Sequence, residues 1–390
     1  MNWIVQLKNR LKPKLGIGGL IDRYLHKFLM GSTTIEQLVE PAQLNIEIQP
    51  AEISTPEIME MNILPKAKSI QQDTYSVPAA YSTVLDNVLY SPIYNVLATR
   101  SRQIILDSIN TKRSVRRFSV SNLYRRPTKK IAGVCSIFRT PSASYYHTLV
   151  ESVPRLYLLD REEYKTIDTI QLLFPSPPNP VEAYYLEKML PVNATVKVVD
   201  EDYLYLTDRL IFPSFLTRRF AGYLPSQYLQ YFQEKVLPNR PRNKKNRILI
   251  SRSPDRRQVL EKVSGVGRYE REHLGQGRYI LNEEELFDGL KDYGFKQYTL
   301  ESLSIPEQIE LFYDAEYVIG AHGAGLTNIL CCDRISILEL FPSKFTLPHY
   351  YYLAKSLGHT HSYWCGNEEN FHAPFTVNVA EIIEGVRVLG

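Results

Sequence analysis

Short apolar runs alternate with amphipathic stretches along most of the chain from about residue 80 onward. Runs rich in Val, Ile and Leu predict buried strands, and stretches with an apolar residue every three or four positions predict helices. This alternation is typical of βαβ units, in which helices cover a parallel sheet. We therefore expect an α/β fold. The strands predicted in the first half are 131–138, 169–174, 195–199 and 209–212.

A second alternating series follows the passage LPNRPRNKKN, whose prolines and basic residues indicate a linker. Asn282 stands three residues before Glu285, and Ser304 stands three before Glu307, so each pair predicts the capped start of a helix. The helices predicted here are 282–294 and 304–315, and the strands are 247–252, 295–300, 315–320 and 335–341.

The pattern divides the chain into two α/β halves, residues 80–236 and residues 237–365, followed by a tail at 366–390. Residues 1–79 precede both halves. They comprise a basic segment and then a stretch with scattered prolines, which we expect to be an arm that wraps the first half.

Residues 1–30 carry six Lys and Arg residues against one Asp, interleaved with apolar residues. Such a segment can lie on an anionic membrane surface or form a helix packed on the protein, and the sequence leaves both alternatives open. It lacks the apolar core and cleavage site of a secretory signal. The sequence also has no run of about 18 apolar residues that would span a bilayer.

Composition narrows the class of protein. The chain has 390 residues, of which 44% are hydrophobic and 23% charged, as in ordinary globular proteins. A net charge of +4 is small for this length and does not indicate a nucleic-acid-binding protein. The four cysteines do not have the spacing of a zinc site, and we expect buried free thiols in a reducing compartment.

The sequence GAHGAG at 320–325 separates a predicted strand from a predicted helix. In α/β sheets, this position is where ligands bind. Free backbone N–H groups favour an anion there, and Gly323 and Gly325 would let a diphosphate approach the backbone. His322 adds a donor for a phosphate or a sugar hydroxyl, and Asn328 adds a further polar contact. Tight packing of the turn is the alternative explanation for its glycines.

A second group of polar residues lies in SASYYHTLVESVPRL. Ser144 can cap a helix on which His147 and Glu151, four residues apart, share a face, and Pro154 should kink this helix before Arg155. The neighbouring side chains are apolar, and a partly buried carboxylate can accept a proton in catalysis. An internal ion pair that holds the helix is an equally supported alternative. The spacing lacks the third ligand that a zinc site needs, so no metal is predicted.

A basic stretch runs from Arg240 to Arg257, and most of it should be a solvated linker. Arg252 differs because it follows the apolar run 248–250 and should stand at the carboxyl end of a strand. It is a candidate to bind a diphosphate.

These segments occur in the order found in one known family. The sequence resembles the catalytic domain of glycosyltransferase family 61, over about residues 130–345, in YYHTLVESVPRL, ILISR, RYILNEEEL, LSIPEQIELFYDAEYVIGAHGAGLTNIL and ILELFP. That family includes plant β-1,2-xylosyltransferases, grass xylan arabinosyltransferases, extracellular O-linked N-acetylglucosamine transferases and bacterial polysaccharide-synthesis proteins.

The resemblance implies a GT-B fold, in which two Rossmann-like domains face a cleft and the C-terminal domain holds the nucleotide sugar, a UDP-sugar in our expectation. It implies an inverting transfer without a metal or other cofactor, to a glycan or lipid-linked saccharide acceptor in polysaccharide biosynthesis. Glu151 is then the expected base, with His147 as its alternative or partner and Arg155 as support. The expected donor-binding residues are Arg252, His322, Gly323, Gly325, Asn328 and Glu339.

Two of these expectations have alternatives. Glu339 can bond ribose hydroxyls or serve as a packing carboxylate. Asp200 and Asp202 form a D-x-D sequence, which holds Mn²⁺ or Mg²⁺ in metal-dependent transferases of the GT-A class. The enzymatic function itself also has an alternative, a non-catalytic carbohydrate-binding or scaffold protein that keeps the fold. Secretory-pathway relatives carry a signal or spanning segment, and we see none in this sequence, so we expect a cytoplasmic enzyme. Contact between residues 1–30 and the inner membrane is left open.

Overall fold

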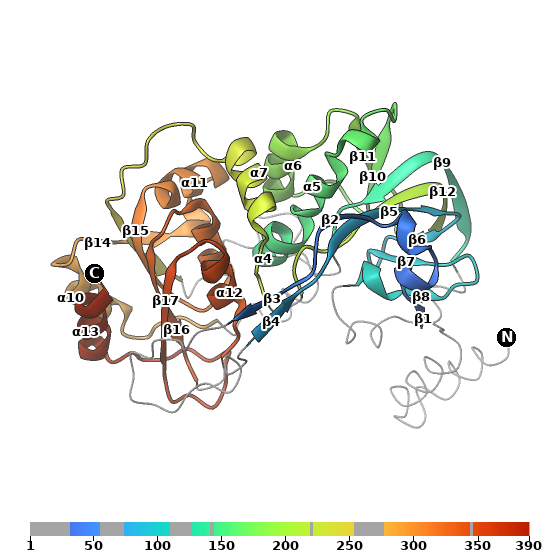
Figure 1. Ribbon diagram of the computed structural model, residues 1–390. Coiled ribbons are helices and arrows are strands. Elements are labelled where there is room, and N and C mark those ends of the chain that lie inside the picture. The colour runs from blue at the N-terminus through green and yellow to red at the C-terminus, as the bar shows by residue number, and fades with distance from the viewer. Residues whose placement is uncertain are drawn as a thin grey trace, which may run out of the picture.

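The computed structural model describes residues 32–54, 74–109, 126–140, 144–218, 221–252, 277–343 and 346–389. Two sheets organise this part of the chain, and helices lie between and around them (Figure 1). The expectations for residues 1–30, and for the basic stretch beyond Arg252, lie outside the described residues.

The C-terminal half is built on a five-stranded parallel sheet with the order β14-β13-β15-β16-β17. Since the first strand in sequence pairs with both the second and the third, the chain order reverses between β13 and β15. The carboxyl ends of the strands at such a reversal form the usual ligand-binding crevice of an open α/β sheet. The strands are β13 Asn246–Ser251, β14 Phe295–Thr299, β15 Ala315–Ala321, β16 Ser336–Phe341 and β17 Thr360–Cys365.

The helices of this half confirm most of the predicted pattern. Ser304 and Glu307 form the expected capping box, in which each side chain binds the other residue's backbone N–H. Asn282 stands at the N-cap of its helix as predicted, but its side chain makes no capping hydrogen bond. Its side-chain oxygen accepts from the N–H of Val377, and its amide donates to Glu285 and to the carbonyl of Val377. The helices are α10 Glu283–Lys291, α11 Ile305–Tyr313, α12 His349–Ser356 and α13 Val379–Leu389, with 3₁₀ turns η7 Leu300–Ser302 and η8 Ala324–Cys331.

The predicted tail packs into the C-terminal half. Phe375, Val377, Ile382 and Val386 are buried in one core cluster with residues of α10 and of the sheet. The peptide groups of Phe375 bond the backbone on both sides of Ile280. Helices α10 and α13 therefore lie together on the outer side of this half (Figure 1).

The N-terminal half contains a ten-stranded mixed sheet, which differs from the parallel Rossmann-like sheet that we expected. Strands β9 to β12 are parallel, but β5 and β6 run antiparallel to β12, and β6 to β8 pair antiparallel in sequence. The connections between β5, β6 and β7 have only a few residues, which is too short for the crossover that parallel strands require, so these strands pair antiparallel. The bounds are β1 Ser32–Thr33, β2 Asn45–Ile48, β5 Ala80–Asp86, β6 Leu89–Ser91, β7 Val96–Ala98, β8 Ile104–Ile105, β9 Thr128–Ile137, β10 Ile170–Phe174, β11 Ala194–Val198 and β12 Leu204–Pro213.

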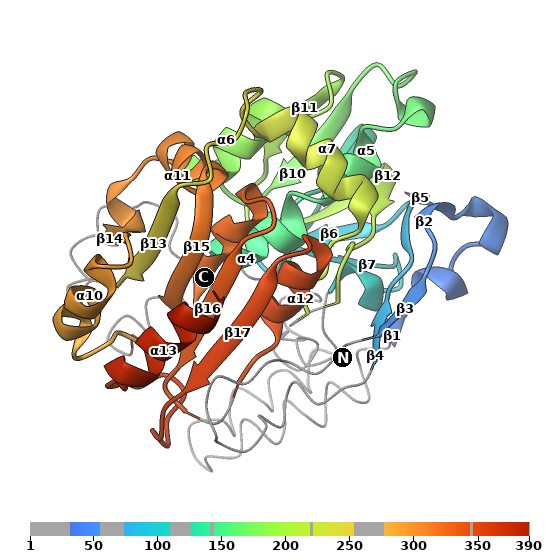
Figure 2. The ribbon, with the colours of Figure 1, turned by 60° about the vertical axis from the view of Figure 1, so that its left-hand side comes forward.

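Four helical elements of this half lie between the two sheets in both ribbon views (Figures 1 and 2). They are the short α4 with the turn that continues it, α5, α6 and α7. The bounds are α4 Tyr145–His147, α5 Arg155–Leu159, α6 Pro180–Met189 and α7 Ser226–Val236, with 3₁₀ turns η1 Ile35–Gln37, η2 Pro41–Gln43, η3 Leu106–Ser108 and η6 Glu162–Tyr164.

The expected N-terminal arm supplies strands. β1 pairs with β8, and β2 pairs with β5, so described residues of this region extend the N-terminal sheet. A separate hairpin, β3 (Ala51–Ser54) with β4 (Thr74–Val77), reaches toward the C-terminal half (Figure 1). There the ring of Tyr75 packs 4.6 Å from the ring of Tyr352 on α12. The hairpin thus ties the two halves together.

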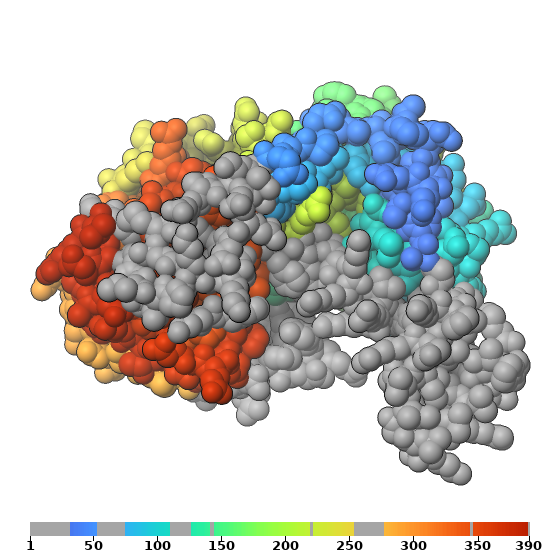
Figure 3. Space-filling model, turned by 60° about the horizontal axis from the view of Figure 1, so that its bottom comes forward, coloured from blue at the N-terminus to red at the C-terminus, as the bar shows by residue number. Residues whose placement is uncertain are grey.

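The two halves share one apolar core. Its buried residues include Leu149 and Val150 from the N-terminal half and Ile250, Ile329 and Leu353 from the C-terminal half. Figure 3 shows the C-terminal surface in red on one side of this face and the first described strands in blue on the other. Among the described helices, none is long and apolar enough to cross a membrane.

The basic linker is more ordered than its charge suggested. Arg240 forms a two-pronged ion pair with Asp314, and the guanidinium of Arg242 lies 3.9 Å from the ring centre of Tyr313. Arg242 also donates to the carbonyl of Cys331 at the end of η8. The linker therefore fixes the position of η8. All four cysteines are free and buried, as expected.

Replacement of Gly222 by alanine should weaken the contact between the halves. Gly222 has a φ of +72°, and a Cβ there would lie 2.5 Å from the carbonyl oxygen of His349 and 2.8 Å from the Tyr146 hydroxyl. We expect Gly222→Ala to lower the free energy of unfolding by about 3 kcal/mol, from backbone strain plus overpacking. Gly358 is the control, because it has a similar φ of +69° and open space around its Cβ position. Denaturant unfolding should show a loss of only about 1 kcal/mol for Gly358→Ala, and equal losses at both positions would contradict the contact.

Candidate functional site

The chain reversal in the C-terminal sheet brings two predicted residues together. Arg252 follows β13 and His322 follows β15, and these strands pair directly, with Ile250 opposite Gly320. Both residues therefore stand at the carboxyl edge of adjacent strands. This is the position that the sequence predicted for an anionic ligand.

Gly323 makes room for Arg252. A Cβ at Gly323 would lie 1.2 Å from Nη2 of Arg252, so any side chain there would displace the guanidinium. Gly325 has a packing role, because its Cβ position is 3.1 Å from Leu300 and 3.4 Å from Ile250. The glycines thus let the turn pack closely against the sheet and the arginine, as the packing alternative proposed.

The segment after the turn is a 3₁₀ helix, and it buries Asn328. The side-chain amide of Asn328 donates to Gln308 and to the carbonyl of Gly325, while its oxygen accepts from the Tyr145 hydroxyl at 2.7 Å. Asn328 is fully buried, with every one of these groups engaged. These contacts give Asn328 a structural role, the attachment of α4 to η8, and its contact with a donor stays a prediction.

Glu339 had two expected roles, a contact with ribose hydroxyls or packing inside the protein. It lies inside β16 and is 1% exposed, and its two oxygens contact Nδ1 of His322 and, at 2.8 Å, Nε2 of His361. A carboxylate that already accepts two hydrogen bonds inside the protein is poorly placed to bind ribose. Of the two alternatives, the buried packing carboxylate fits better. Sequence reasoning missed His361, because its β17 segment is not an apolar run.

Aromatic rings and two arginines surround His322. The ring stacks on Phe341 at 5.0 Å, and Tyr350 and Phe371 lie within 5.4 Å of it, centre to centre. Burial lowers the pKa of His322 below its usual value, and the charges of Arg278 and Arg252 lower it further, against the opposing effect of Glu339. Arg278 was not predicted as a site residue, since it lies at the edge of the RYIL segment rather than after an apolar run.

In the N-terminal half, a π-helical turn at Thr148–Ser152 follows α4 and carries Glu151. Val153 donates to the carbonyl of Thr148, five residues back, and Pro154 has no N–H with which to continue an α-helical pattern. Ser144 caps the start of this segment, as predicted. The predicted kink is therefore a π turn.

His147 and Glu151 share one face of this turn. Nδ1 of His147 lies 3.0 Å from Oε1 of Glu151, and the Glu151 side chain is 3% exposed. The angles do not fit a hydrogen bond, and within the described residues neither atom has another hydrogen-bond partner. Both atoms keep the capacity to bind a proton or a hydroxyl. Pairs of this kind are found at catalytic centres, although they also occur as internal ion pairs.

Arg155 was expected to support Glu151, but its guanidinium makes no hydrogen bond to Glu151 among the described residues. Its guanidinium donates to the carbonyls of Pro213 and Phe138. Burial lowers the pKa of Arg155 to about 9, so it remains charged at neutral pH. It stabilises the strand ends behind the π turn and acts on Glu151 only through its charge.

Tyr146 joins the two groups of residues. Its ring contacts His147 at 5.3 Å and meets His349 edge-on at 4.9 Å, and the His349 ring is 5.6 Å from the ring of His322. A continuous series of ring contacts thus runs from the π turn to the Gly-rich turn. Both predicted groups belong to one candidate site at the junction of the halves.

The D-x-D sequence lies elsewhere, on the connection between β11 and β12. Asp200 accepts from the backbone N–H of Asp202, and Asp202 is paired with Arg126 at 3.4 Å. Within the described ranges, no group of three His, Cys, Asp or Glu residues is placed to hold a metal ion.

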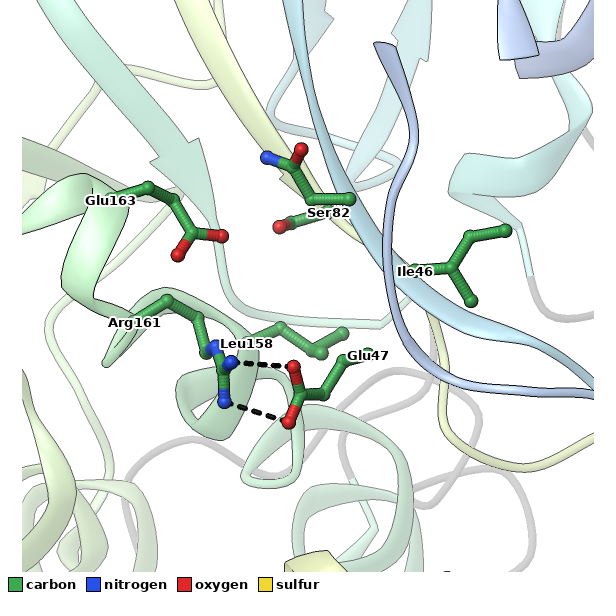
Figure 4. Close-up of a pocket in the computed structure, with 7 residues that line it drawn as sticks. Ile46, Glu47, Ser82, Leu158, Arg161 and Glu163 are labelled. Carbon is green, nitrogen blue, oxygen red and sulfur yellow. Dashed lines mark hydrogen bonds and ion pairs between the residues drawn. The ribbon is translucent and has the colours of Figure 1, made fainter. Parts of the chain in front are cut away.

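A polar cavity of about 330 Å³ lies in the N-terminal half (Figure 4). Glu47 and Arg161 form an ion pair across it, with a distance of 2.6 Å. It lies beside β2 and the end of α5, apart from the series of rings described above. Its lining residues are Asn45, Ile46, Glu47, Ser82, Leu158, Arg161 and Glu163.

Comparisons with known proteins identify the region that contains the site. Residues 145–337 match the family model described as Glycosyltransferase 61. A beta-1,2-xylosyltransferase from Arabidopsis thaliana is 30% identical over 125 residues, which cover 28% of this chain and 23% of that protein. The similarity thus spans less than a quarter of the relative's own length.

His359, which anchors η8, should make stability depend on pH. Its ring bonds the carbonyl of Ile329 and the N–H of Ile335, and burial lowers its pKa to about 4. The unfolded chain binds the proton near pH 6.5, so stability is full above that pH and falls as the pH drops toward 4. Relative to His359→Gln, the wild type should lose about 2.5 kcal/mol of unfolding free energy between about pH 7 and pH 4.5. Identical pH profiles in denaturant titrations would show that His359 is not buried in its neutral form.

Proposed function

Because residues 145–337 belong to the glycosyltransferase 61 family, we propose that this protein transfers a sugar from a nucleotide sugar, a UDP-sugar in the first instance, to a saccharide acceptor. The proposed transfer inverts the anomeric centre and needs no metal ion. The observation that carries the proposal is the series of ring contacts that links His147, beside Glu151, to His322 at the carboxyl edge of the C-terminal sheet.

The C-terminal side supplies positive charge for the donor. Arg252 and Arg278 both lie close enough to His322 to lower its pKa. Guanidinium groups bind phosphate oxygens strongly and stabilise the negative charge that develops on a departing diphosphate. This supports a donor site that functions without a divalent cation. Asp200 and Asp202 remain the alternative for a metal-dependent reaction.

The N-terminal side supplies the base. In a single displacement, the acceptor hydroxyl attacks the anomeric carbon, the bond to the diphosphate breaks, and the base takes the hydroxyl proton. Oε1 of Glu151 has no hydrogen-bond partner among the described residues, and His147 lies 3.0 Å away to share the proton. This supports Glu151 as base with His147 as partner.

The donor sugar, the acceptor and the cellular setting complete the proposal. The relative is named a xylosyltransferase, so UDP-xylose is the first donor to test. A glycan or lipid-linked saccharide is the proposed acceptor, in polysaccharide biosynthesis. We place the enzyme in the cytoplasm, and the basic and apolar residues of the segment 1–30 support contact with an anionic membrane surface. The GT-B arrangement is part of the same proposal, supported by the reversal in the C-terminal sheet.

Loss of Arg252 should weaken nucleotide binding. In calorimetric titrations with UDP in EDTA, we expect Arg252→Gln to raise Kd about 10- to 100-fold, since a charge-assisted hydrogen bond is lost. Gly323→Ala should have a similar effect, because its Cβ displaces the guanidinium without removing the charge. Arg209→Gln is the control, on a side chain that is 61% exposed in the N-terminal sheet. UDP binding only in the presence of Mn²⁺ would favour the D-x-D alternative.

Loss of Glu151 should slow the transfer while leaving donor binding unchanged. We expect Glu151→Gln to lower kcat about 10²- to 10⁴-fold, as removal of a general base does, with the Kd for UDP within about twofold of wild type. The assay is UDP release from UDP-xylose with a panel of saccharide acceptors. Glu163→Gln, at the separate cavity, should retain full activity. Full activity of Glu151→Gln together with loss in His147→Gln would move the base to His147.

A further inference from the structure

The contact of Glu339 with two histidines determines which nitrogen of His322 carries a proton. An ionised carboxylate only accepts hydrogen bonds, so each histidine nitrogen that faces it must donate. The nitrogens that face Glu339 are Nδ1 of His322 and Nε2 of His361. Within the β16 environment the pKa of Glu339 is lowered, against the effect of burial, by the two histidines, so the carboxylate form persists.

The groups around His322 favour a neutral ring. Arg252 and Arg278 oppose a further positive charge, and the other neighbours are the rings of Phe341, Phe371 and Tyr350 and the imidazole of His349. His361 lies behind Glu339 on β17. A neutral ring with a proton on Nδ1 has an unprotonated Nε2, which accepts hydrogen bonds and cannot donate one.

We propose that Glu339 and His361 are positioning residues that hold His322 with its proton on Nδ1, so that Nε2 accepts a hydrogen bond from a hydroxyl of the bound nucleotide sugar. The inference rests on the proposed function for its ligand. It changes the expected role of His322, because an acceptor nitrogen repels phosphate oxygens and selects a hydroxyl. The diphosphate is then left to Arg252 and Arg278, and His322 reads the ribose or the transferred sugar.

His361 has a separate purpose in this arrangement. A single hydrogen bond from His322 would let the Glu339 carboxylate rotate within β16, whereas a second bond at 2.8 Å on its other oxygen fixes its plane. Nδ1 of His361 is buried and has no hydrogen-bond partner among the described residues. His361 therefore acts on the site only through the hydrogen bond from its Nε2 to Glu339. Carboxylates that orient a functional histidine are commonly held by such further hydrogen bonds.

The first test reads the tautomer without any ligand. The protein is labelled with ¹⁵N at its eight histidines, and long-range ¹H–¹⁵N spectra distinguish protonated from unprotonated ring nitrogens. His322→Gln identifies the His322 signals. We expect a protonated Nδ1 and an unprotonated Nε2 at neutral pH in the wild type. In Glu339→Gln the amide can donate as well as accept, so the His322 signals should shift toward the other tautomer or a mixture.

Variants at His361 separate positioning from simple packing. His361→Gln keeps a donor for Glu339 and should preserve the His322 tautomer, whereas His361→Phe keeps the ring volume and should lose the preference. Glu316→Gln is the matched control. Glu316 pairs with Arg247 at the amino end of β15, whereas His322 follows the carboxyl end of the same strand. Circular dichroism and thermal melting confirm that each variant is folded before its spectrum is read.

The second test measures binding of UDP and UDP-xylose by calorimetry. Glu339→Gln should raise Kd about 3- to 10-fold, which is the effect of one neutral hydrogen bond. If Kd rises for both UDP and UDP-xylose, the hydroxyl that donates to His322 belongs to the ribose. If Kd rises for UDP-xylose alone, that hydroxyl belongs to the transferred sugar. Either pattern supports the inference, and unchanged Kd values for both contradict it.

The two tests fail separately. A protonated Nε2 on His322 in the wild type overturns the inference even if UDP binds and sugar is transferred. A wild-type protein that binds neither nucleotide contradicts the proposed function, and with it the hydroxyl ligand, while the spectra still decide whether Glu339 and His361 set the tautomer.

Discussion

The packing of α4 against η8 and α12 is the interaction on which the rest of the site depends. Tyr145 bonds Asn328, and Tyr146 contacts His349, so one short segment of the N-terminal half touches both η8 and α12. Neither half buries these rings alone. Because the apolar core is continuous across the junction, the positions of His147 and His322 are coupled by packing. A change that loosens the junction should disturb the proposed base and donor site together.

Charge within the site is arranged by burial. Arg252 lies where Gly323 has no side chain, and Glu339 is enclosed by two histidines inside the sheet. A buried carboxylate is stable only when its oxygens are satisfied, and here the satisfying groups are themselves titratable.

The sequence predicted the C-terminal sheet well because its strands are continuous apolar runs between capped helices. β13 to β16 and α11 follow the predicted boundaries within about two residues. β17 was missed because THSYWC alternates polar and aromatic residues although it is almost wholly buried, and its buried polar groups are explained only by partners such as Glu339. The N-terminal strands β1 to β8 were missed for a different reason. Apart from the seven-residue β5, these strands have only two to four residues and carry no periodicity, and the pairing of β5 with β12 depends on a partner far along the chain.

The candidate site shows the same limit at the level of single side chains. Motif position was sufficient to bring Glu151, His147, Arg252 and His322 together, since strand ends and turns are set by local sequence. It could not distinguish a polar residue that faces a ligand from one that satisfies a buried neighbour. Asn328 was therefore predicted to contact the donor, and both roles were left open for Glu339. Their roles depend on contacts with Tyr145 and His361, which are 183 and 22 residues away along the chain. A polar residue in a motif next to a crevice is therefore as often a support of the site as a part of its surface, and only the three-dimensional hydrogen-bond inventory separates the two.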